Sequence, residues 1–245
     1  MGIRFLNCGT MRPYFPRVEN GITCILAETN QGLVLIDTGL GMGDYLNPGR
    51  TMRFFTAAMR SPRDINETAI SQVKQLGYQP GDVRNIVMTH LHLDHAGGLP
   101  DFPHAKVHVY QPEHDHVVNG HLSWEYNPSH WMHTPDWAPH VLSGERWYDF
   151  DAIQLKGFIP EIWLIPLTGH TAGHSAVAIR TDTGWAMHGG DAVPFNMAVD
   201  DVPDGISRLL IGPHVPRIRE FRNEHPEVQI VGAHMSLDFY EKQRT

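Results

Sequence analysis

Residues 89–95 read THLHLDH and place three imidazoles and a carboxylate within one short segment. The segment follows an apolar run, so its polar side chains are expected where a strand gives way to a turn. Residues two apart in an extended chain point the same way, which predicts that His90 and His92 face one point together. Asp94 and His95 lie past the strand end and can face an adjacent point. This spacing favours two neighbouring metal ions over one.

Three more side chains of the metal-ligand type follow apolar runs further along the chain. They are His170 in LTGHTAGH, Asp191 in HGGDA and His234 in VGAHM. Imidazole and carboxylate without thiolate suit Zn²⁺ best, with Mn²⁺, Fe²⁺ and Co²⁺ as alternatives. Two such ions turn a bridging water into a hydroxide nucleophile and polarise a carbonyl, so the reaction needs no serine or cysteine nucleophile.

The composition is that of a folded, acidic chain rich in histidine. The 245 residues include 17 His, nearly as many as the 19 Lys and Arg together, and histidine is the commonest metal ligand. A hydrophobic fraction of 41% can build a real core. The net charge of −8 disfavours a nucleic-acid partner, because phosphates would be repelled. No apolar run is long enough to predict a membrane span.

The N-terminal residues and the cysteines predict a cellular setting. The opening MGIRFLNCGT has an arginine within its short apolar stretch and no small-residue cleavage site, so we expect no targeting segment. Cys8 and Cys24 lie in apolar runs, which favours buried free thiols over a disulfide framework. A reducing, cytoplasmic setting is therefore expected.

Runs of strands, each followed by a helix, must position the candidate ligands. Two apolar runs at 22–28 and 32–37 predict a hairpin, and apolar residues three apart predict a helix at 66–76 behind an Asn66 cap. Further elements are strands at 85–90, 106–110, 159–167, 174–180, 184–188 and 228–233 and a helix at 213–224. This order predicts a layered α/β fold.

The regular spacing of apolar residues becomes weak over residues 111–145. This predicts an inserted segment, rich in aromatic residues and histidine, of irregular or partly helical structure. Four of its side chains are candidates for a substrate pocket wall, with a homodimer contact and local packing as alternatives: Trp124, Tyr126, Trp131 and Trp137. As a pocket wall, this segment would favour substrates with an apolar acyl tail.

Together, THLHLDHAGG, GHTAGH, GGDA and GAH resemble the motifs of the metallo-β-lactamase superfamily of binuclear metallohydrolases. IDTG at 36–39 resembles the early strand-end Asp of that family. The resemblance extends from about residue 20 to 235 and implies that residues 1–245 form a single αββα sandwich. It places the site at the strand ends along one edge.

The resemblance also implies a role for each candidate ligand. The implied set is His90, His92 and His170 on one metal, Asp94, His95 and His234 on the other, and Asp191 bridging them. Asp94 would in addition act as the catalytic acid/base, and Asp37 would accept a hydrogen bond from a ligand imidazole. We expect His174 and His188 to be packed or hydrogen-bonded instead, because the ligand set is already full.

Within the superfamily, the pattern favours N-acyl-homoserine lactonases and related lactonases. Thiol-ligand β-lactamases have a Cys where this chain has Asp191, and flavo-diiron proteins usually have a Glu where it has His92. One departure is Pro194, which stands where lactonases of this kind often have a Tyr near the substrate carbonyl. Either Tyr126 replaces that donor or the substrate is different.

The expected function is therefore that of a binuclear hydrolase acting on a small molecule. A metal-bridging hydroxide would attack the carbonyl of a lactone of the N-acyl-homoserine type or of a related ester. The alternatives are a mononuclear iron oxidoreductase of the persulfide dioxygenase type, a thioesterase of the glyoxalase-II type, and a metal-stabilised binding protein without turnover. Metal content and a substrate panel distinguish them.

Overall fold

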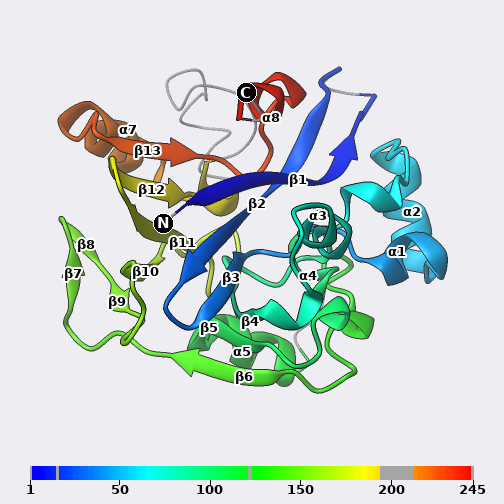
Figure 1. The fold of residues 1–245 in the computed structure, drawn as a ribbon, viewed down its shortest axis with the longest axis horizontal. Helices are drawn as coiled ribbons and strands as arrows, with labels where there is room; N and C mark the ends of the chain where they lie inside the picture. The colour runs from blue at the N-terminus through cyan, green and yellow to red at the C-terminus, as the bar shows by residue number, and fades with distance from the viewer. Residues whose placement is uncertain (1, 15–16, 121–122, 194–211, 244–245) are drawn as a thin grey trace.

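The computed structural model describes residues 2–14, 17–120, 123–193 and 212–243 (Figure 1). The strands are β1 (Ile3–Met11), β2 (Asn20–Thr29), β3 (Gly32–Ile36), β4 (Val83–Val87), β5 (Lys106–Tyr110), β6 (Asp136–His140), β7 (Arg146–Trp147), β8 (Phe150–Asp151), β9 (Ile153–Gln154), β10 (Ile162–Pro166), β11 (Ser175–Thr181), β12 (Gly184–His188) and β13 (Val228–Val231). The α-helices are α1 (Met42–Leu46), α2 (Arg50–Ala58), α3 (Ala69–Gln75), α4 (Leu93–Ala96), α5 (Gln111–Val118), α7 (Val215–Glu224) and α8 (Leu237–Gln243). Short 3₁₀ turns include η1 (Ile65–Glu67), η4 (Pro128–His130) and η5 (Gly190–Ala192).

Two mixed sheets form the centre of the molecule. The first has the order β1-β2-β3-β4-β5-β6, antiparallel from β1 to β3 and parallel from β3 to β6. The second has the order β13-β12-β11-β10-β9, in which only β12 and β13 are parallel. Parallel neighbours need a crossover connection, and helices supply it between β3 and β4 and between β12 and β13.

Alternation along the strands sorts the apolar side chains into layers. On β2, Ile25 and Ala27 pack into the core between the two sheets, whereas Cys24 and Leu26 pack into the core on the outer side. Helix α3 covers that outer side, with Val73 in the same core. Helix α7 covers the outer face of the second sheet (Figure 1). The layers are thus helix, sheet, sheet, helix, which confirms the predicted αββα sandwich.

The structure contains most of the predicted helices and strands, but several of them begin or end at other residues than predicted. The predicted hairpin is β2 and β3. The helix predicted at 66–76 begins later, at α3, because the Thr68 side chain and not Asn66 accepts the Ser71 N–H. The strand predicted at 159–167 shortens to β10, and the helix predicted at 213–224 begins two residues later as α7.

The sequence pattern missed β1, α2, β6 and α8. Strand β1 has a break in its register between Asn7 and Thr10, so its side chains do not alternate regularly. Strand β6 contains Pro139 and lies at the edge of its sheet, where a missing N–H is tolerated. Residues 111–145 thus hold α5, η4 and β6.

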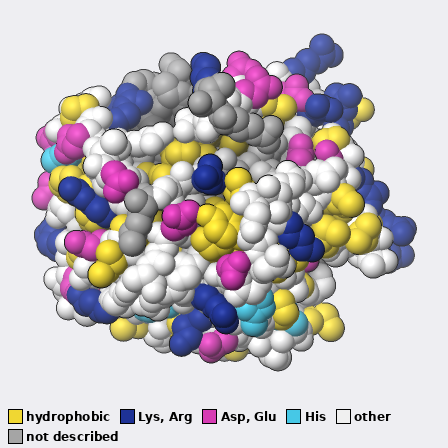
Figure 2. Space-filling view, in the orientation of Figure 1, with side chains coloured by type: hydrophobic (Ala, Val, Ile, Leu, Met, Phe, Trp, Pro, Cys, Tyr) yellow, Lys and Arg dark blue, Asp and Glu magenta, His cyan; other side chains and the backbone are white. Residues whose placement is uncertain are grey.

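Other sequence expectations concern the surface and the thiols. Cys8 and Cys24 are both buried and free, as predicted. No helix within the described residues combines the length and the apolar content that a membrane crossing requires. Acidic and basic side chains are interspersed over the face that Figure 2 shows.

A chain of hydrogen bonds joins three strands of the first sheet through two histidines. His108 Nε2 donates to Asn85 Oδ1 at 3.0 Å, so His108 Nδ1 carries a lone pair and accepts from His140 Nε2 at 2.9 Å. Burial, together with the neighbouring His140 and Lys106, lowers the pKa of His108 to about 4. The folded protein therefore holds His108 neutral.

This arrangement predicts an acid-dependent loss of stability. Because the pKa of His108 is lower in the folded than in the unfolded chain, the unfolded chain binds more protons as the pH falls below about 6.5. Between pH 7.5 and pH 5, the free energy of unfolding of the wild type should fall about 2 kcal/mol more than that of His108→Gln. Urea unfolding at equal metal loading measures this, and equal losses in both proteins would refute the interpretation.

Candidate metal centre

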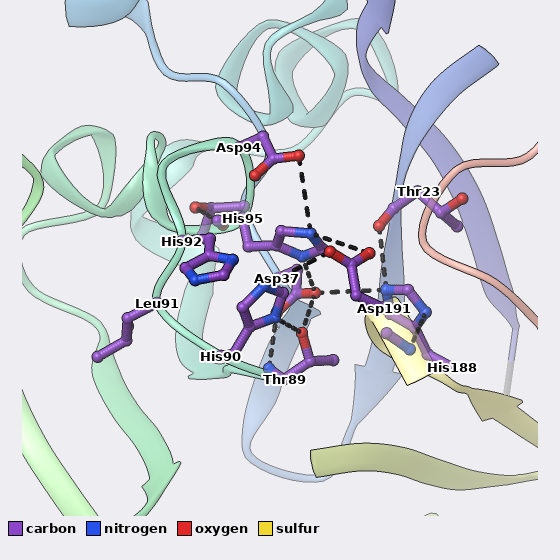
Figure 3. Close-up of polar contacts among 12 residues, drawn as sticks. Thr23, Asp37, Thr89, His90, Leu91, His92, Asp94, His95, His188 and Asp191 are labelled. Carbon is purple, nitrogen blue, oxygen red and sulfur yellow. Dashed lines mark hydrogen bonds and ion pairs between the residues drawn. The ribbon is translucent and has the colours of Figure 1, made fainter. Parts of the chain in front are cut away.

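The loop between β4 and α4 carries four of the candidate ligands. The sequence predicted a strand through His90, but β4 ends at Val87, so His90 and His92 stand on the loop. Asp94 and His95 lie in the single turn of α4. The four side chains nevertheless converge, as Figure 3 shows.

Two buried carboxylates take the place of a neighbouring strand along this loop. Thr89 donates its backbone N–H to Asp37 Oδ1 at 2.8 Å and its hydroxyl to Asp37 Oδ2 at 2.7 Å. Leu91 donates its N–H to Glu113 Oε1 at 2.9 Å. Both carboxylates are fully buried, so these hydrogen bonds act where water does not compete. They hold the loop in the shape that turns its imidazoles inward.

The remaining candidate ligands also follow strands. His170 comes after β10, Asp191 lies in η5 directly after β12, and His234 comes after β13. The structure brings all of them to the β4–α4 loop and forms two donor groups. The first donor group is His90, His92, His170 and Asp191, and the second donor group is Asp94, His95 and His234; within each, one donor atom per residue lies within 4.8 Å of the others.

The carboxylate of Asp191 lies between the two donor groups. Its Oδ2 is 3.1 Å from His170 Nε2 and 3.7 Å from His90 Nε2. Its Oδ1 is 3.3 Å from His234 Nε2 and 3.7 Å from His95 Nε2. One oxygen therefore faces each group, which is the placement that a bridging ligand needs.

The two groups differ in electrostatics. Burial and the neighbouring imidazoles lower the pKa of His90 well below its usual range and that of His92 to about 3, so both rings keep a free lone pair. Burial alone would also lower the pKa of His95, but the carboxylates of Asp94, Asp191 and Asp37 raise it. The second group thus has a negative potential that favours a cation.

Several donor atoms fit a metal and lack any other partner. His90 Nε2, His95 Nε2 and Asp191 Oδ1 are buried and accept or donate no hydrogen bond within the described part of the chain. Burying such an atom without a partner costs about 1 to 3 kcal/mol. Imidazole and carboxylate donors are what a divalent transition metal binds, and coordination would offset that cost.

Asp37 holds one donor ring from behind. Its Oδ2 lies 2.8 Å from His95 Nδ1, which leaves His95 Nε2 directed at Asp191. Burial would raise the pKa of Asp37, but the His95 and His188 imidazoles outweigh it and hold that pKa below its usual range. His188 itself is buried at the end of β12 and lies 3.1 Å from the Thr23 carbonyl oxygen. His188 is therefore packed, as the sequence analysis expected.

His174 positions the bridging residue instead of joining either donor group. Its Nε2 accepts the Asp191 backbone N–H at 3.0 Å, and its Nδ1 donates to the Leu167 carbonyl at 3.1 Å. Both ring nitrogens are thus occupied, in agreement with the expected hydrogen-bonding role. A side chain at Gly190 would approach His174 Nε2 to 2.5 Å, and its φ of +54° also suits glycine.

A cavity of about 480 Å³ opens beside His92 and His170. Tyr126, a candidate pocket residue, lines it and packs its ring against His92 with centroids 4.8 Å apart. The three tryptophans proposed for the same wall are not among its described lining residues. Trp131 and Trp137 pack against the core of the first sheet, and Trp124 is exposed.

Glu113, in the first turn of α5, escaped the sequence analysis. Besides Leu91, its carboxylate accepts the Thr171 hydroxyl at 2.6 Å, the Gly173 N–H at 3.0 Å and the Tyr126 hydroxyl at 3.2 Å. It thereby ties the His90–His92 loop to the loop that follows His170. Only a glycine fits at 173, because a Cβ there would lie 2.1 Å from the Glu113 backbone nitrogen.

Glu113→Gln should weaken metal binding at the first donor group by about 10- to 100-fold, because the amide nitrogen cannot accept these hydrogen bonds. Chelator competition measures the affinity of each site. Glu67→Gln is the matched control, because Glu67 accepts hydrogen bonds from the backbone and hydroxyl of Thr10. Equal metal affinities in the two variants would contradict this role for Glu113.

The chain is similar to known proteins over most of its length. The family model of the metallo-beta-lactamase superfamily matches residues 17–203. A probable metallo-hydrolase of Mycobacterium tuberculosis is 36% identical over 261 residues, covering 99% of this chain and 82% of that protein. An N-acyl homoserine lactonase of a Bacillus species is 29% identical over 162 residues, covering 66% of this chain and 59% of the lactonase.

Solved structures share the fold. A mutant of AiiA from Bacillus thuringiensis, with N-decanoyl-L-homoserine bound at its active site, superposes with a TM-score of 0.73 at 20% identity, covering 98% of this chain and 95% of that one. A probable metal-dependent hydrolase from Staphylococcus aureus superposes with a TM-score of 0.68 at 18% identity, covering 96% of this chain and 89% of that one. The chain belongs to the metallo-beta-lactamase superfamily and is one of its metal-dependent hydrolases.

Proposed function

We propose that this protein hydrolyses the ester bond of a lactone, of the N-acyl-homoserine type or a close relative, with two divalent metal ions. The observation that carries the proposal is the carboxylate of Asp191, whose two oxygens face separate donor groups. The similarity to N-acyl homoserine lactonases supports the choice of substrate.

The two donor groups would each hold one metal ion, with Asp191 shared between them. Zinc is the first choice for this donor set, and manganese, iron and cobalt are alternatives. When bound, the two ions supply an activated water as the nucleophile and polarise the substrate carbonyl.

We assign the proton transfer of the reaction to Asp94. In the reaction, a water oxygen bonds to the carbonyl carbon, the ring C–O bond breaks, and a proton passes from water to the departing oxygen. Asp94 Oδ2 lies 3.6 Å from His234 Nε2, and its side chain retains 14% exposure toward solvent. It would take the proton from water and deliver it to the leaving oxygen, which yields the hydroxy acid.

Tyr126 does not supply the hydroxyl donor that Pro194 cannot provide. The Tyr126 hydroxyl already donates to Glu113, and burial together with that carboxylate raises the pKa of this phenol. Tyr126 therefore forms the cavity wall and supports His92. Position 194 lies outside the described residues.

Metal analysis combined with a substrate panel tests the proposed function. Protein purified without added metal should contain about two metal ions per chain. It should open lactones in a pH-stat assay, lose this activity with a chelator and regain it with zinc. One iron per chain with persulfide-dependent oxygen uptake would support the dioxygenase alternative. Hydrolysis of thioesters and of no other substrate would support the thioesterase alternative. Two bound metal ions without hydrolysis of any substrate would support a binding protein.

The assignment of ligands to the two groups predicts distinct losses. His234→Ala should bring the metal content from about two per chain toward one, because the first donor group stays complete. His170→Ala should weaken the first site instead. Metal quantification after gel filtration measures both, with His108→Ala as a control that removes a buried imidazole whose hydrogen-bond partners are Asn85 and His140, outside both groups. Full metal content in both ligand variants would show that the assignment is wrong.

A further inference from the structure

The cavity beside the first donor group has polar side chains in its wall, where the sequence analysis expected an apolar wall. Its described lining includes His116, Ser123, Glu125 and Thr168, together with His92 and His170 of the donor group. Glu125 is the lining carboxylate, and neither Lys nor Arg lines the described part of this cavity. Such a wall suits a polar substituent better than an alkyl tail, since a tail would desolvate these groups without replacing their hydrogen bonds.

Glu125 is fixed in place relative to the metal ligands. Its backbone carbonyl accepts the Leu93 N–H at 2.8 Å, and Leu93 lies between the candidate ligands His92 and Asp94. The next residue, Tyr126, is buried between His92 and the Glu113 carboxylate. The segment at 125–126 therefore stays at a set distance from the donor group, and the Glu125 side chain is presented to the cavity from a rigid support.

The carboxylate of Glu125 keeps its charge available to a ligand. Its Oε2 accepts a hydrogen bond from the Ser123 hydroxyl at 3.1 Å, and the side chain is only half-buried. It forms no ion pair within the described residues, and the chain as a whole carries a net charge of −8. A cationic group in the cavity would thus gain attraction without displacing a resident Lys or Arg.

We propose that Glu125 selects lactone or ester substrates that carry a positively charged group, such as a substituted ammonium, on the acyl side of the scissile carbonyl. This inference rests on the proposed function, because it concerns the substrate of the same site. It replaces the apolar acyl tail expected from the tryptophans. Those rings pack elsewhere or lie exposed, and the cavity presents a carboxylate instead.

A pair of lactones with the same shape tests the selection. One is γ-butyrolactone with a trimethylammonium group on the carbon next to the carbonyl, and the other is its tert-butyl analogue. The ratio of their kcat/KM values in the zinc-loaded wild type should fall about 5-fold in Glu125→Gln, and the change should lie mainly in KM. The comparison between proteins removes the intrinsic difference in reactivity between the lactones. High salt should reduce the wild-type ratio.

Two controls separate this inference from the proposed function. Glu161→Gln neutralises an exposed carboxylate that does not line the cavity and should leave the ratio unchanged. Saturation-transfer NMR on the metal-free protein, where the lactones stay intact, should show tighter binding of the cationic lactone to wild type than to Glu125→Gln. An unchanged ratio in Glu125→Gln, with both lactones hydrolysed, would overturn the inference and leave the proposed function standing. Failure of the metal-loaded wild type to open any lactone of the substrate panel, these two included, would overturn the proposed function, and the NMR result would then decide the inference alone.

Discussion

The metal centre depends on two buried carboxylates that replace a strand's hydrogen bonds. Asp37 takes the Thr89 N–H and Glu113 takes the Leu91 N–H, at the point where β4 has ended. Without these acceptors, the loop would bury backbone donors unpaired, at a cost of about 1 to 3 kcal/mol each. Because the carboxylates accept these backbone hydrogen bonds, the loop can leave the sheet and present His90 and His92 to the same space.

The same two carboxylates serve the donor groups in different ways. Asp37 contacts a candidate ligand directly, at His95 Nδ1, and so fixes which ring nitrogen faces the metal site. Glu113 instead accepts backbone and hydroxyl hydrogen bonds, and it joins the loops that carry His92 and His170. Each donor group thus has one buried anion behind it. This arrangement would offset the charge of cations held by the donor groups.

The sandwich supplies the edge at which these parts meet. Strands β4, β10, β12 and β13 belong to two sheets, and each ends just before a candidate ligand. Packing in the core between the sheets, to which Val87 of β4 and Val177 of β11 both belong, sets the separation of the edges. Asp191 then spans the junction, held from the second sheet by His174. The distance between the donor groups is therefore a property of the core as much as of the loops.

The sequence predicted those parts of the molecule that short stretches of residues specify by themselves. The ligand motifs could be found because His and Asp at these spacings have few other uses, and β2, β3, β11 and β12 could be found from apolar runs. The role of Glu113 could not be found from the sequence, because a lone Glu in the first turn of a helix is usually solvent-exposed. Its role arises only from the approach of Gly173 in the folded chain. The sequence could not place the three tryptophans either, which are not among the described lining residues of the cavity, since aromatic side chains serve core and pocket equally well.

The proposed function requires Asp191 to join two metal ions. X-ray absorption spectroscopy on zinc-loaded protein measures the separation of the ions directly. A bridging Asp191 predicts a metal–metal vector of about 3.5 to 4 Å that is lost in Asp191→Ala. A spectrum of isolated zinc ions in fully loaded wild type, with no metal neighbour within that range, would contradict it.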